Sequence, residues 1–444
     1  MIITIVGAST TGTYLAKYLS DEQMDIYIVD KDVNKLLALD TEYNLMTVVG
    51  DGTVFATLRQ AEVEKCDLFI SVTNVAERNI VACGMAKSMG AKMTVARVDR
   101  NDYLEQDNQT VIQKMGVDKV IFPESLIARG IIESLNHSCF RFWYEFQKQE
   151  LIMVGIRLED NTPLTYKYLR ELNQYHDLFH VSVIRRDFRT LIPNGNYILM
   201  PNDILYLTTS EKHLPEVVEL TGKQAYDIKK IVVARTGKIT ELLLEYAPKH
   251  LHFTVIEQDI NMARELSRLF PSVDIIHGES SEFEVLNEAG IAQADAFIAL
   301  EDSSQGNILS CLTAKDLGVK KSIAEIERSQ FFNMAESFNI GTILNKQVLM
   351  ADAVFQLLID AGAISSKCLV LPDAVVLRLD IKPGAKITSS QVKDLKIPEE
   401  ITFAGFIREN QARLVNGQTT FLPGDTVLVV CLQGALQKAQ KLFR

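Results

Sequence analysis

The sequence lacks the features of membrane-spanning and secreted chains. Over its 444 residues, no apolar run approaches the roughly 18 to 20 residues needed to cross a bilayer. The chain starts with Met1 and the strand-like run Ile2–Val6, without the basic segment and long apolar stretch of a secretory signal. We therefore expect a soluble protein of the cytoplasm.

Cysteine and histidine are few and scattered. The six cysteines and seven histidines form no CxxC pair and no cluster with the spacing of a metal site. We therefore expect no metal, and we interpret the cysteines as small buried apolar side chains in a reducing compartment. His277, the only histidine near a suspected site, is expected to end a strand.

Clusters of basic residues are also missing. The net charge is -11, and lysine and arginine do not gather in patches, which argues against a nucleic-acid partner. The length predicts about two to four domains, and 47% hydrophobic residues are enough to build packed cores.

The chain does contain a long internal repeat, in which the stretch 49–98 returns 228 positions later as 277–326. A period of this length indicates duplicated domains and not a solenoid of short units. The identical pairs are Gly50 and Gly278, Leu58 and Leu286, Ala61 and Ala289, Asp67 and Asp295, Phe69 and Phe297, Ile70 and Ile298, Asn79 and Asn307, Ile80 and Ile308, Cys83 and Cys311, Ala86 and Ala314, Gly90 and Gly318, and Ala96 and Ala324.

Each copy alternates strand and helix patterns, as in a doubly wound parallel sheet. In the first copy the expected strands are Ile2–Val6, Asp25–Val29, Met46–Val49, Leu68–Thr73, Met93–Val98 and Val120–Phe122. A helix and an aromatic cluster over Phe140–Phe146 follow; we interpret that cluster as a packing or interface surface. The chain then becomes rich in strands.

The same order returns in the second half of the chain. The predicted fold class is α/β, with two Rossmann-like doubly wound lobes, each followed by a small α+β lobe rich in β-strands. The predicted domains are 1–137 (first Rossmann-like lobe), 138–224 (first C-lobe), 225–364 (second Rossmann-like lobe) and 365–444 (second C-lobe).

The turn after the first strand carries the clearest chemical motif: Gly7, Ala8, Ser9, Thr10, Thr11 and Gly12. A dinucleotide fingerprint needs three glycines, for the tight turn, the approach of a pyrophosphate and the packing of helix on strand. Gly7 and Gly12 stand at the first and third places, whereas Ser9 replaces the second glycine. The helix that starts here offers free amides and a positive dipole end to an anion.

Other polar residues follow the neighbouring strands at the same sheet edge. Asp30 ends the second strand, where fingerprint enzymes hold a ribose hydroxyl, and its carboxylate would repel a 2′-phosphate, which favours NAD(H) or an adenine nucleotide over NADP. Further candidates at this edge are Lys31, Asp51, Gly52, Thr73, Asn74 and Arg97. Arg97 could contact a phosphate or form a salt bridge.

The second copy has changed at the same turn. Arg235–Thr240 lacks the first and third glycines, and Glu257 offers a carboxylate one step out of the constant register. Either Arg235 and Lys238 bind a phosphate, or this lobe keeps the fold without the ligand.

These motifs, doubled and joined to β-rich lobes, resemble the TrkA-type family built from RCK (KTN) domains. The resemblance covers the whole chain. It implies a non-enzymatic, cytoplasmic regulatory subunit of a Trk potassium-uptake system that binds NAD or NADH, with ATP or ADP as the alternative ligands. It also implies a homo-oligomeric, tetrameric ring at the inner face of the membrane, where nucleotide-driven shape changes gate a membrane-embedded channel subunit.

The resemblance also implies roles for particular residues: Gly7, Ser9 and Gly12 at the pyrophosphate, Asp30 at a ribose, Asp51 and Gly52 near the adenosine, Thr73 and Asn74 beside the nucleotide, and Arg97 at a phosphate. The alternative is an NAD-dependent oxidoreductase, which would need an acid or base near the nicotinamide. We identify no catalytic residue; His176 and His180 are isolated and are interpreted as structural.

Overall fold

The computed structural model describes residues 1–20, 24–42, 45–146, 151–160, 162–360, 367–371, 373–409 and 411–443. These residues form two compact units. The first consists of Met1–Ala128 with Asn345–Val354, and the second of Arg129–Leu344 with Phe355–Arg444. The boundary falls within two helices, α6 (Pro123–Asn136) and α13 (Lys346–Asp360).

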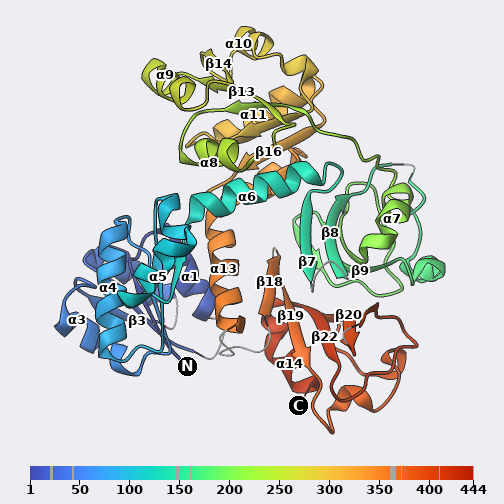
Figure 1. Ribbon diagram of the computed structural model, residues 1–444. Helices are drawn as coiled ribbons and strands as arrows, with labels where there is room; N and C mark the ends of the chain where they lie inside the picture. Colours follow the sequence, from blue (N-terminus) through green and yellow to red (C-terminus); the bar gives the residue numbers. More distant parts are fainter. Residues whose placement is uncertain are drawn as a thin grey trace. The chain divides into compact units, whose positions relative to one another are not determined.

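The first unit contains the six-stranded parallel sheet that the alternating pattern predicted (Figure 1), and its strand order is β3-β2-β1-β4-β5-β6. Its strands are β1 (Ile2–Val6), β2 (Asp25–Asp30), β3 (Met46–Val49), β4 (Leu68–Ser71), β5 (Met93–Arg97) and β6 (Lys119–Ile121). The helices are α1 (Thr10–Ser20), α2 (Val33–Glu42), α3 (Phe55–Gln60), α4 (Ala76–Met89), α5 (Gln106–Lys114) and α6 (Pro123–Asn136).

Apolar residues of this sheet form a buried cluster with helices α3 and α4. Phe69 of β4 packs with Leu58 of α3 and with Ile80 and Cys83 of α4. Because the strands are parallel, their carboxyl ends all meet at one edge of the sheet, and the strand order reverses between β1 and β4. Ligands of doubly wound sheets bind at this point.

The second unit repeats this architecture with the order β14-β13-β12-β15-β16-β17. The strands are β12 (Lys230–Ala234), β13 (His252–Glu257), β14 (Asp274–His277), β15 (Ala296–Ala299), β16 (Lys321–Glu325) and β17 (Thr342–Leu344). The helices are α8 (Lys238–Tyr246), α9 (Ile260–Leu269), α10 (Phe283–Glu288), α11 (Ser304–Asp316), α12 (Phe332–Ser337) and α13 (Lys346–Asp360). His277 ends β14, as expected.

Two five-stranded antiparallel sheets complete the second unit, in the orders β10-β9-β11-β8-β7 and β18-β19-β22-β20-β21. The first has β7 (Phe142–Phe146), β8 (Leu151–Arg157), β9 (Phe179–Arg186), β10 (Arg189–Leu191), β11 (Ile204–Thr209) and helix α7 (Leu214–Leu220). The second has β18 (Lys367–Leu371), β19 (Ala374–Asp380), β20 (Ile401–Arg408), β21 (Gln411–Leu414), β22 (Thr426–Leu432) and helix α14 (Leu436–Leu442).

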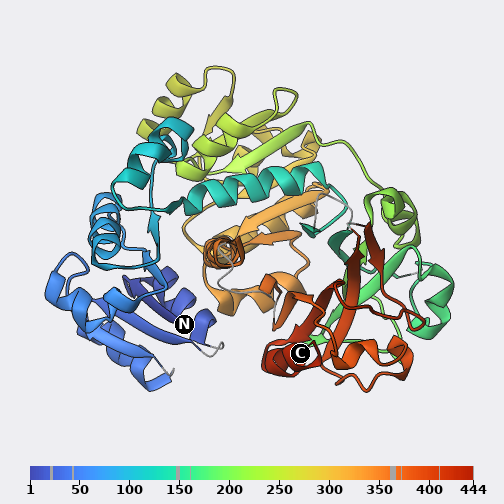
Figure 2. The ribbon, with the colours of Figure 1, turned by 60° about the horizontal axis from the view of Figure 1, so that its bottom comes forward.

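The two antiparallel sheets pack on each other through a shared apolar layer (Figure 2). Met153 and Tyr206 of the first sheet join Val376 and Val430 of the second in this layer. Gly405 of β20 allows the close approach, since a Cβ there would lie 2.7 Å from Leu151. The two C-lobes are therefore paired within one chain.

The aromatic cluster after α6 forms strand β7 at the edge of the first antiparallel sheet. Phe146 belongs to the layer between the sheets, and Phe142 meets Tyr206 edge-on, so the interpretation as a packing surface is confirmed. Among the described residues, no helix is long and apolar enough to cross a membrane. Cys66, Cys83, Cys139, Cys311 and Cys431 are free thiols, and all of them except Cys139 are buried.

Candidate functional site

Two glycines shape the turn between β1 and α1. Gly7 has a φ of +104°, which favours glycine, and a Cβ on it would lie 3.1 Å from the backbone nitrogen of Thr73. A Cβ on Gly12 would collide with the carbonyl oxygen of Gly7. Both positions therefore require glycine, as the fingerprint predicted.

Between these glycines, Ser9 turns its hydroxyl inward. Its Oγ accepts a hydrogen bond from the Gly12 amide at 3.4 Å and lies 3.5 Å from the carbonyl oxygen of Val72. Ala8 and Thr11 are buried, whereas Thr10 is exposed at the start of α1. The serine hydroxyl thus stabilises the first turn of α1. The N-terminus of this helix begins at the carboxyl-end edge of the sheet.

Asp30 joins the end of β2 to this turn. Its Oδ2 accepts a hydrogen bond from the Ala8 amide at 2.6 Å, and its Oδ1 accepts one from the Asp32 amide at 2.9 Å. The side chain remains partly exposed. The carboxylate therefore fixes the backbone of the turn, and its contact with a ribose stays a prediction.

Lys31 and Asp51 form an ion pair beside Asp30, with Lys31 Nζ 2.6 Å from Asp51 Oδ2. Asp51 Oδ1 also accepts hydrogen bonds from the amide and hydroxyl of Thr53. The hydrogen bond from Lys31 is the main reason that the pKa of Asp51 falls to about 2. Gly52 lies over β1, where a Cβ would collide with Val6.

A buried asparagine connects the ends of β4 and β5. The amide of Asn79 donates to the carbonyl oxygens of Thr73 and Arg97, both at 2.9 Å. Its oxygen accepts hydrogen bonds from the backbone and the hydroxyl of Thr73. Asn79 thus fixes the loop that carries Thr73 and Asn74. Its recurrence as Asn307 was the signal in the sequence, although its role was not predicted.

Arg97 has protein partners in the structure. Its guanidinium donates to Asn74 Oδ1 at 3.1 Å and lies 3.7 Å from Glu124 Oε1. The salt bridge, one of the two roles left open by the sequence, is therefore formed, and contact with a phosphate stays a prediction. Glu124, at the start of α6, also lies 3.3 Å from Lys346 Nζ, and the sequence pattern did not single it out.

The second Rossmann-like lobe keeps the same framework. Glu257 Oε2 accepts a hydrogen bond from the Thr236 amide at 2.7 Å, the interaction that Asp30 makes with Ala8. The one-step shift in register places Glu257, and not Gln258, at the position of Asp30. Asn307 repeats the links of Asn79, with hydrogen bonds to Glu301 and to the carbonyl oxygen of Glu325.

The charges of the second lobe differ from those of the first. Arg235 replaces Gly7, keeps a positive φ of +82°, and pairs with Asp302. Lys238 pairs with Glu241 at 3.1 Å. Both basic residues of this turn therefore have carboxylate partners.

A cavity of about 270 Å³ lies at this edge of the second lobe. Its lining includes Arg235 and four acidic residues, Glu257, Glu279, Glu301 and Asp302. The last two stand where the first lobe has Thr73 and Asn74. A negatively charged pyrophosphate would meet mainly carboxylates in this cavity.

Comparison with protein-family profiles finds two kinds of domain in alternation. The TrkA-N domain matches residues 3–123 and 231–346, and the TrkA-C domain matches residues 153–222 and 376–444. Together the matches account for most of the chain and reproduce its internal repeat.

Two curated relatives are similar along nearly their whole length. The chain is 24% identical to the Trk system potassium uptake protein TrkA of Halomonas elongata, over 100% of this chain and 99% of the relative. It is 25% identical to the Trk system potassium uptake protein TrkA of Vibrio alginolyticus, over 97% and 95%.

Solved structures share the fold. The crystal structure of the GsuK RCK domain matches with a TM-score of 0.59 and 14% identity, over 100% of this chain and 95% of that one. A structure of the GsuK channel bound to NAD matches with a TM-score of 0.57, also at 14% identity, over 100% of this chain and 79% of that one.

Proposed function

This chain belongs to the TrkA family, with two TrkA-N and two TrkA-C domains in alternation, and we propose that it regulates potassium uptake by binding a nucleotide in its first lobe. The full-length relatives named as Trk system potassium uptake proteins support this role. In that role the chain is a regulator and not an enzyme.

The first lobe offers the chemistry of a dinucleotide site. The turn from Gly7 to Gly12 presents the amides and positive end of α1 to a pyrophosphate. The Asp30 carboxylate can accept a hydrogen bond from a ribose hydroxyl and would repel a 2′-phosphate, so the ligand is NAD or NADH. ATP or ADP would compete for the part of the site that binds the adenosine. GsuK, which shares the fold, has been solved with NAD and with ADP.

The second lobe is proposed to be a framework without a nucleotide. Its turn has lost Gly7 and Gly12 in favour of Arg235 and Thr240. The pairing of Arg235 with Asp302 leaves an acidic cavity, which repels phosphate groups. We therefore expect one nucleotide per chain.

The partner is a membrane-embedded Trk-type potassium channel subunit, and the chain assembles as a tetrameric ring at the inner face of the membrane. A ligand shifts a conformational equilibrium only by the difference between its affinities for the two states. The first-lobe site joins the ends of four strands through Asp30, Asn79 and their backbone partners, so a bound nucleotide can favour one arrangement of these loops.

The main support for the nucleotide site is the turn around Gly7 together with Asp30. Calorimetric titration of the full chain with NADH, NAD, ATP and ADP tests whether this site binds a nucleotide. We expect one site per chain for the preferred nucleotide. Asp30→Ala should weaken binding about 10- to 100-fold, the value of a hydrogen bond to a charged group. Asp25→Ala is the matched control, because Asp25 is an exposed aspartate at the opposite end of the same strand.

Potassium flux through the reconstituted channel subunit then tests the regulatory role. We expect the nucleotide that binds to change the flux with the wild-type chain and with Asp25→Ala, but not with Asp30→Ala at the same nucleotide concentration. Tight binding without any effect on flux would contradict the regulatory role and leave the nucleotide site standing. Absence of binding by all four nucleotides would contradict the site itself.

A further inference from the structure

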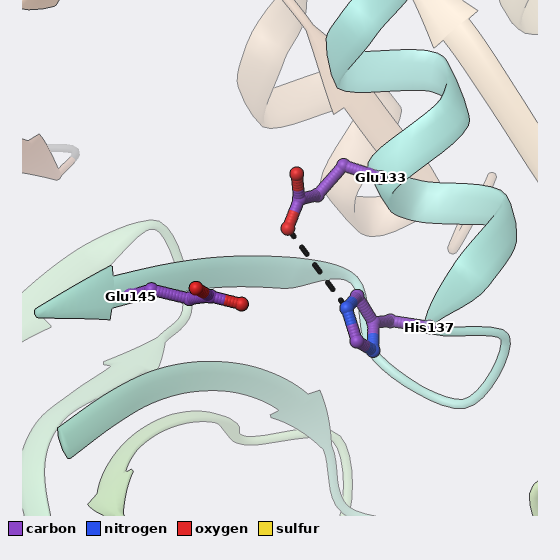
Figure 3. Close-up of side chains that lie close together, drawn as sticks. All are labelled: Glu133, His137 and Glu145. Carbon is purple, nitrogen blue, oxygen red and sulfur yellow. Dashed lines mark ion pairs between the residues drawn. The ribbon is translucent and has the colours of Figure 1, made fainter. Parts of the chain in front are cut away.

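A histidine and two glutamates converge where helix α6 is followed by strand β7 (Figure 3). Glu133 lies in the last turn of α6, and His137 directly follows the helix. The His137 amide still donates a hydrogen bond to the Glu133 carbonyl oxygen, so the two side chains, four residues apart, lie on the same face. Glu145 reaches the same place from β7. The ligand atoms of the three side chains all lie within 4.8 Å of one another.

Trp143 orients two of these three side chains. Its ring is stacked on the imidazole of His137, with the centroids 3.4 Å apart and the planes at 7°. Its indole nitrogen donates a hydrogen bond to Glu145 Oε1 at 3.1 Å. Fixed partners of this kind hold the ligands of metal sites in place.

The charges of the cluster suit a divalent cation. His137 Nε2 lies 3.8 Å from Glu133 Oε1, which is too long for a hydrogen bond. A neutral imidazole has a free ring nitrogen that can coordinate a metal ion. Two carboxylates and a neutral imidazole balance two positive charges.

We propose that Glu133, His137 and Glu145 bind one divalent transition-metal ion, with Zn²⁺ as the reference member of the class. One imidazole nitrogen and two carboxylate oxygens are a ligand set that zinc accepts, at about 2.0–2.2 Å from each atom. Tetrahedral angles would place the ligand atoms about 3.4 Å apart, so the side chains would have to close in by up to about 1.4 Å from their present spacing of at most 4.8 Å. Imidazole disfavours Mg²⁺ and Ca²⁺, which prefer oxygen.

Such an ion would fasten the end of α6 to β7. The intervening loop is also held by Lys321, whose Nζ donates to the carbonyl oxygen of Phe140 at 2.6 Å. The loop links the helix after the first Rossmann-like lobe to the first strand of its C-lobe. Metal binding would therefore stiffen the connection between a lobe and its C-lobe, as an input separate from the nucleotide.

The chain contains its own reporter for this site, because Trp143 is its only tryptophan. We would titrate the full chain with ZnCl₂ by calorimetry and with CoCl₂ by visible absorption, and follow tryptophan fluorescence in both titrations. We expect one ion per chain, a fluorescence change that saturates at the same ratio, and Co²⁺ absorption bands of a nitrogen and oxygen site. CaCl₂ and MgCl₂ should bind at least tenfold more weakly.

Glu133→Gln and Glu145→Gln should each weaken Zn²⁺ binding at least tenfold, since even residues that only orient the ligands have effects of about 10- to 100-fold. Glu216→Gln is the matched control, because Glu216 is an exposed glutamate on helix α7 of the same C-lobe. Circular dichroism would verify that the variants are folded. No saturable Zn²⁺ binding, unchanged binding in both variants, or tighter binding of Ca²⁺ than of Zn²⁺ would overturn the proposal.

Discussion

In the first lobe Gly7 turns the chain into α1 with a φ of +104°, whereas in the second lobe Arg235 makes the same turn with a φ of +82°. A left-handed conformation costs a residue with a side chain about 1–2 kcal/mol, and glycine almost nothing. The second lobe has therefore kept the shape of the turn, although it lacks the glycine that would adopt the positive φ without a conformational cost. The Arg235 side chain is paired with Asp302.

The comparison separates residues that hold the fold from residues that suit a ligand. Asn79 and Asn307 link the same two strand ends in both lobes. Asp67 and Asp295 both accept a hydrogen bond from the amide at the start of the first strand. Identity between the copies thus marks the framework, and the ligand chemistry lies in the positions that differ.

The largest expected effect on nucleotide binding comes from placing a side chain at Gly12, where the second lobe has Thr240. Gly12→Ala should weaken NADH binding by about 100-fold, or about 2.7 kcal/mol, because its Cβ would collide with the Gly7 carbonyl and displace the turn. Thr240→Ala is the control in the second lobe, where the hydroxyl donates to the Arg235 carbonyl at 2.8 Å. Calorimetry should find NADH affinity unchanged in that control.

The comparison would fail if both variants lost affinity equally, since the second lobe would then take part in binding. It would also fail if Gly12→Ala bound NADH normally. Urea unfolding of each variant distinguishes a displaced turn from an unfolded lobe.

The next effect concerns stability alone. Arg235→Gly relieves the strain of the positive φ, which stabilises the fold, and removes the ion pair with Asp302, which destabilises it. The two effects on the free energy of unfolding oppose each other. We expect the free energy of unfolding to change by no more than about 1 kcal/mol, because an ion pair with a largely exposed partner, here Asp302, contributes about that much or less. Urea unfolding measures this change.

The same variant tests whether a glycine is enough to make a site. We expect calorimetry to find no second nucleotide per chain in Arg235→Gly, because Glu301 and Asp302 still face the cavity. A stoichiometry of two would show that the arginine alone blocks the second lobe, and that its acidic lining is compatible with phosphate.

The sequence predicted the framework well, because its signals are local. The six strands of the first lobe were expected within two residues of their observed ends, since each is a short apolar run between turn residues. Strand β7 was not predicted as a strand, because Phe142–Phe146 is almost continuously aromatic and lacks the alternation of a half-buried strand.

The details of the site depend on side-chain directions that spacing does not contain. The sequence placed Asp30 at the sheet edge, but not its hydrogen bond to the Ala8 amide. It left Arg97 between two roles, and the structure shows its contacts with Asn74 and Glu124. The cluster around His137 was also missed, because Glu145 comes from β7 and the spacing 133, 137 and 145 matches no metal motif.

The smallest expected effect lies in the ion pair of Lys31 with Asp51, which the second lobe lacks because Gln258 stands in place of Lys31. Lys31→Gln should raise the pKa of Asp51 from about 2 toward its ordinary value of 3.8. Carbon-13 NMR of the aspartate carboxyl carbons, titrated with acid, measures this shift.

The sign of the pH effect follows from the lowered pKa. The pair stabilises the fold above pH 3.8, and this stabilisation is lost as the pH falls toward about 2. At neutral pH the free energies of unfolding of the wild type and Lys31→Gln should differ by less than about 1 kcal/mol, because the pair is partly exposed, and they should converge near pH 2. A difference that persists below pH 2 would mean that Lys31 stabilises the loop by packing and not through its charge. The second lobe, with Gln258, would then lack an apolar contact and not an ion pair.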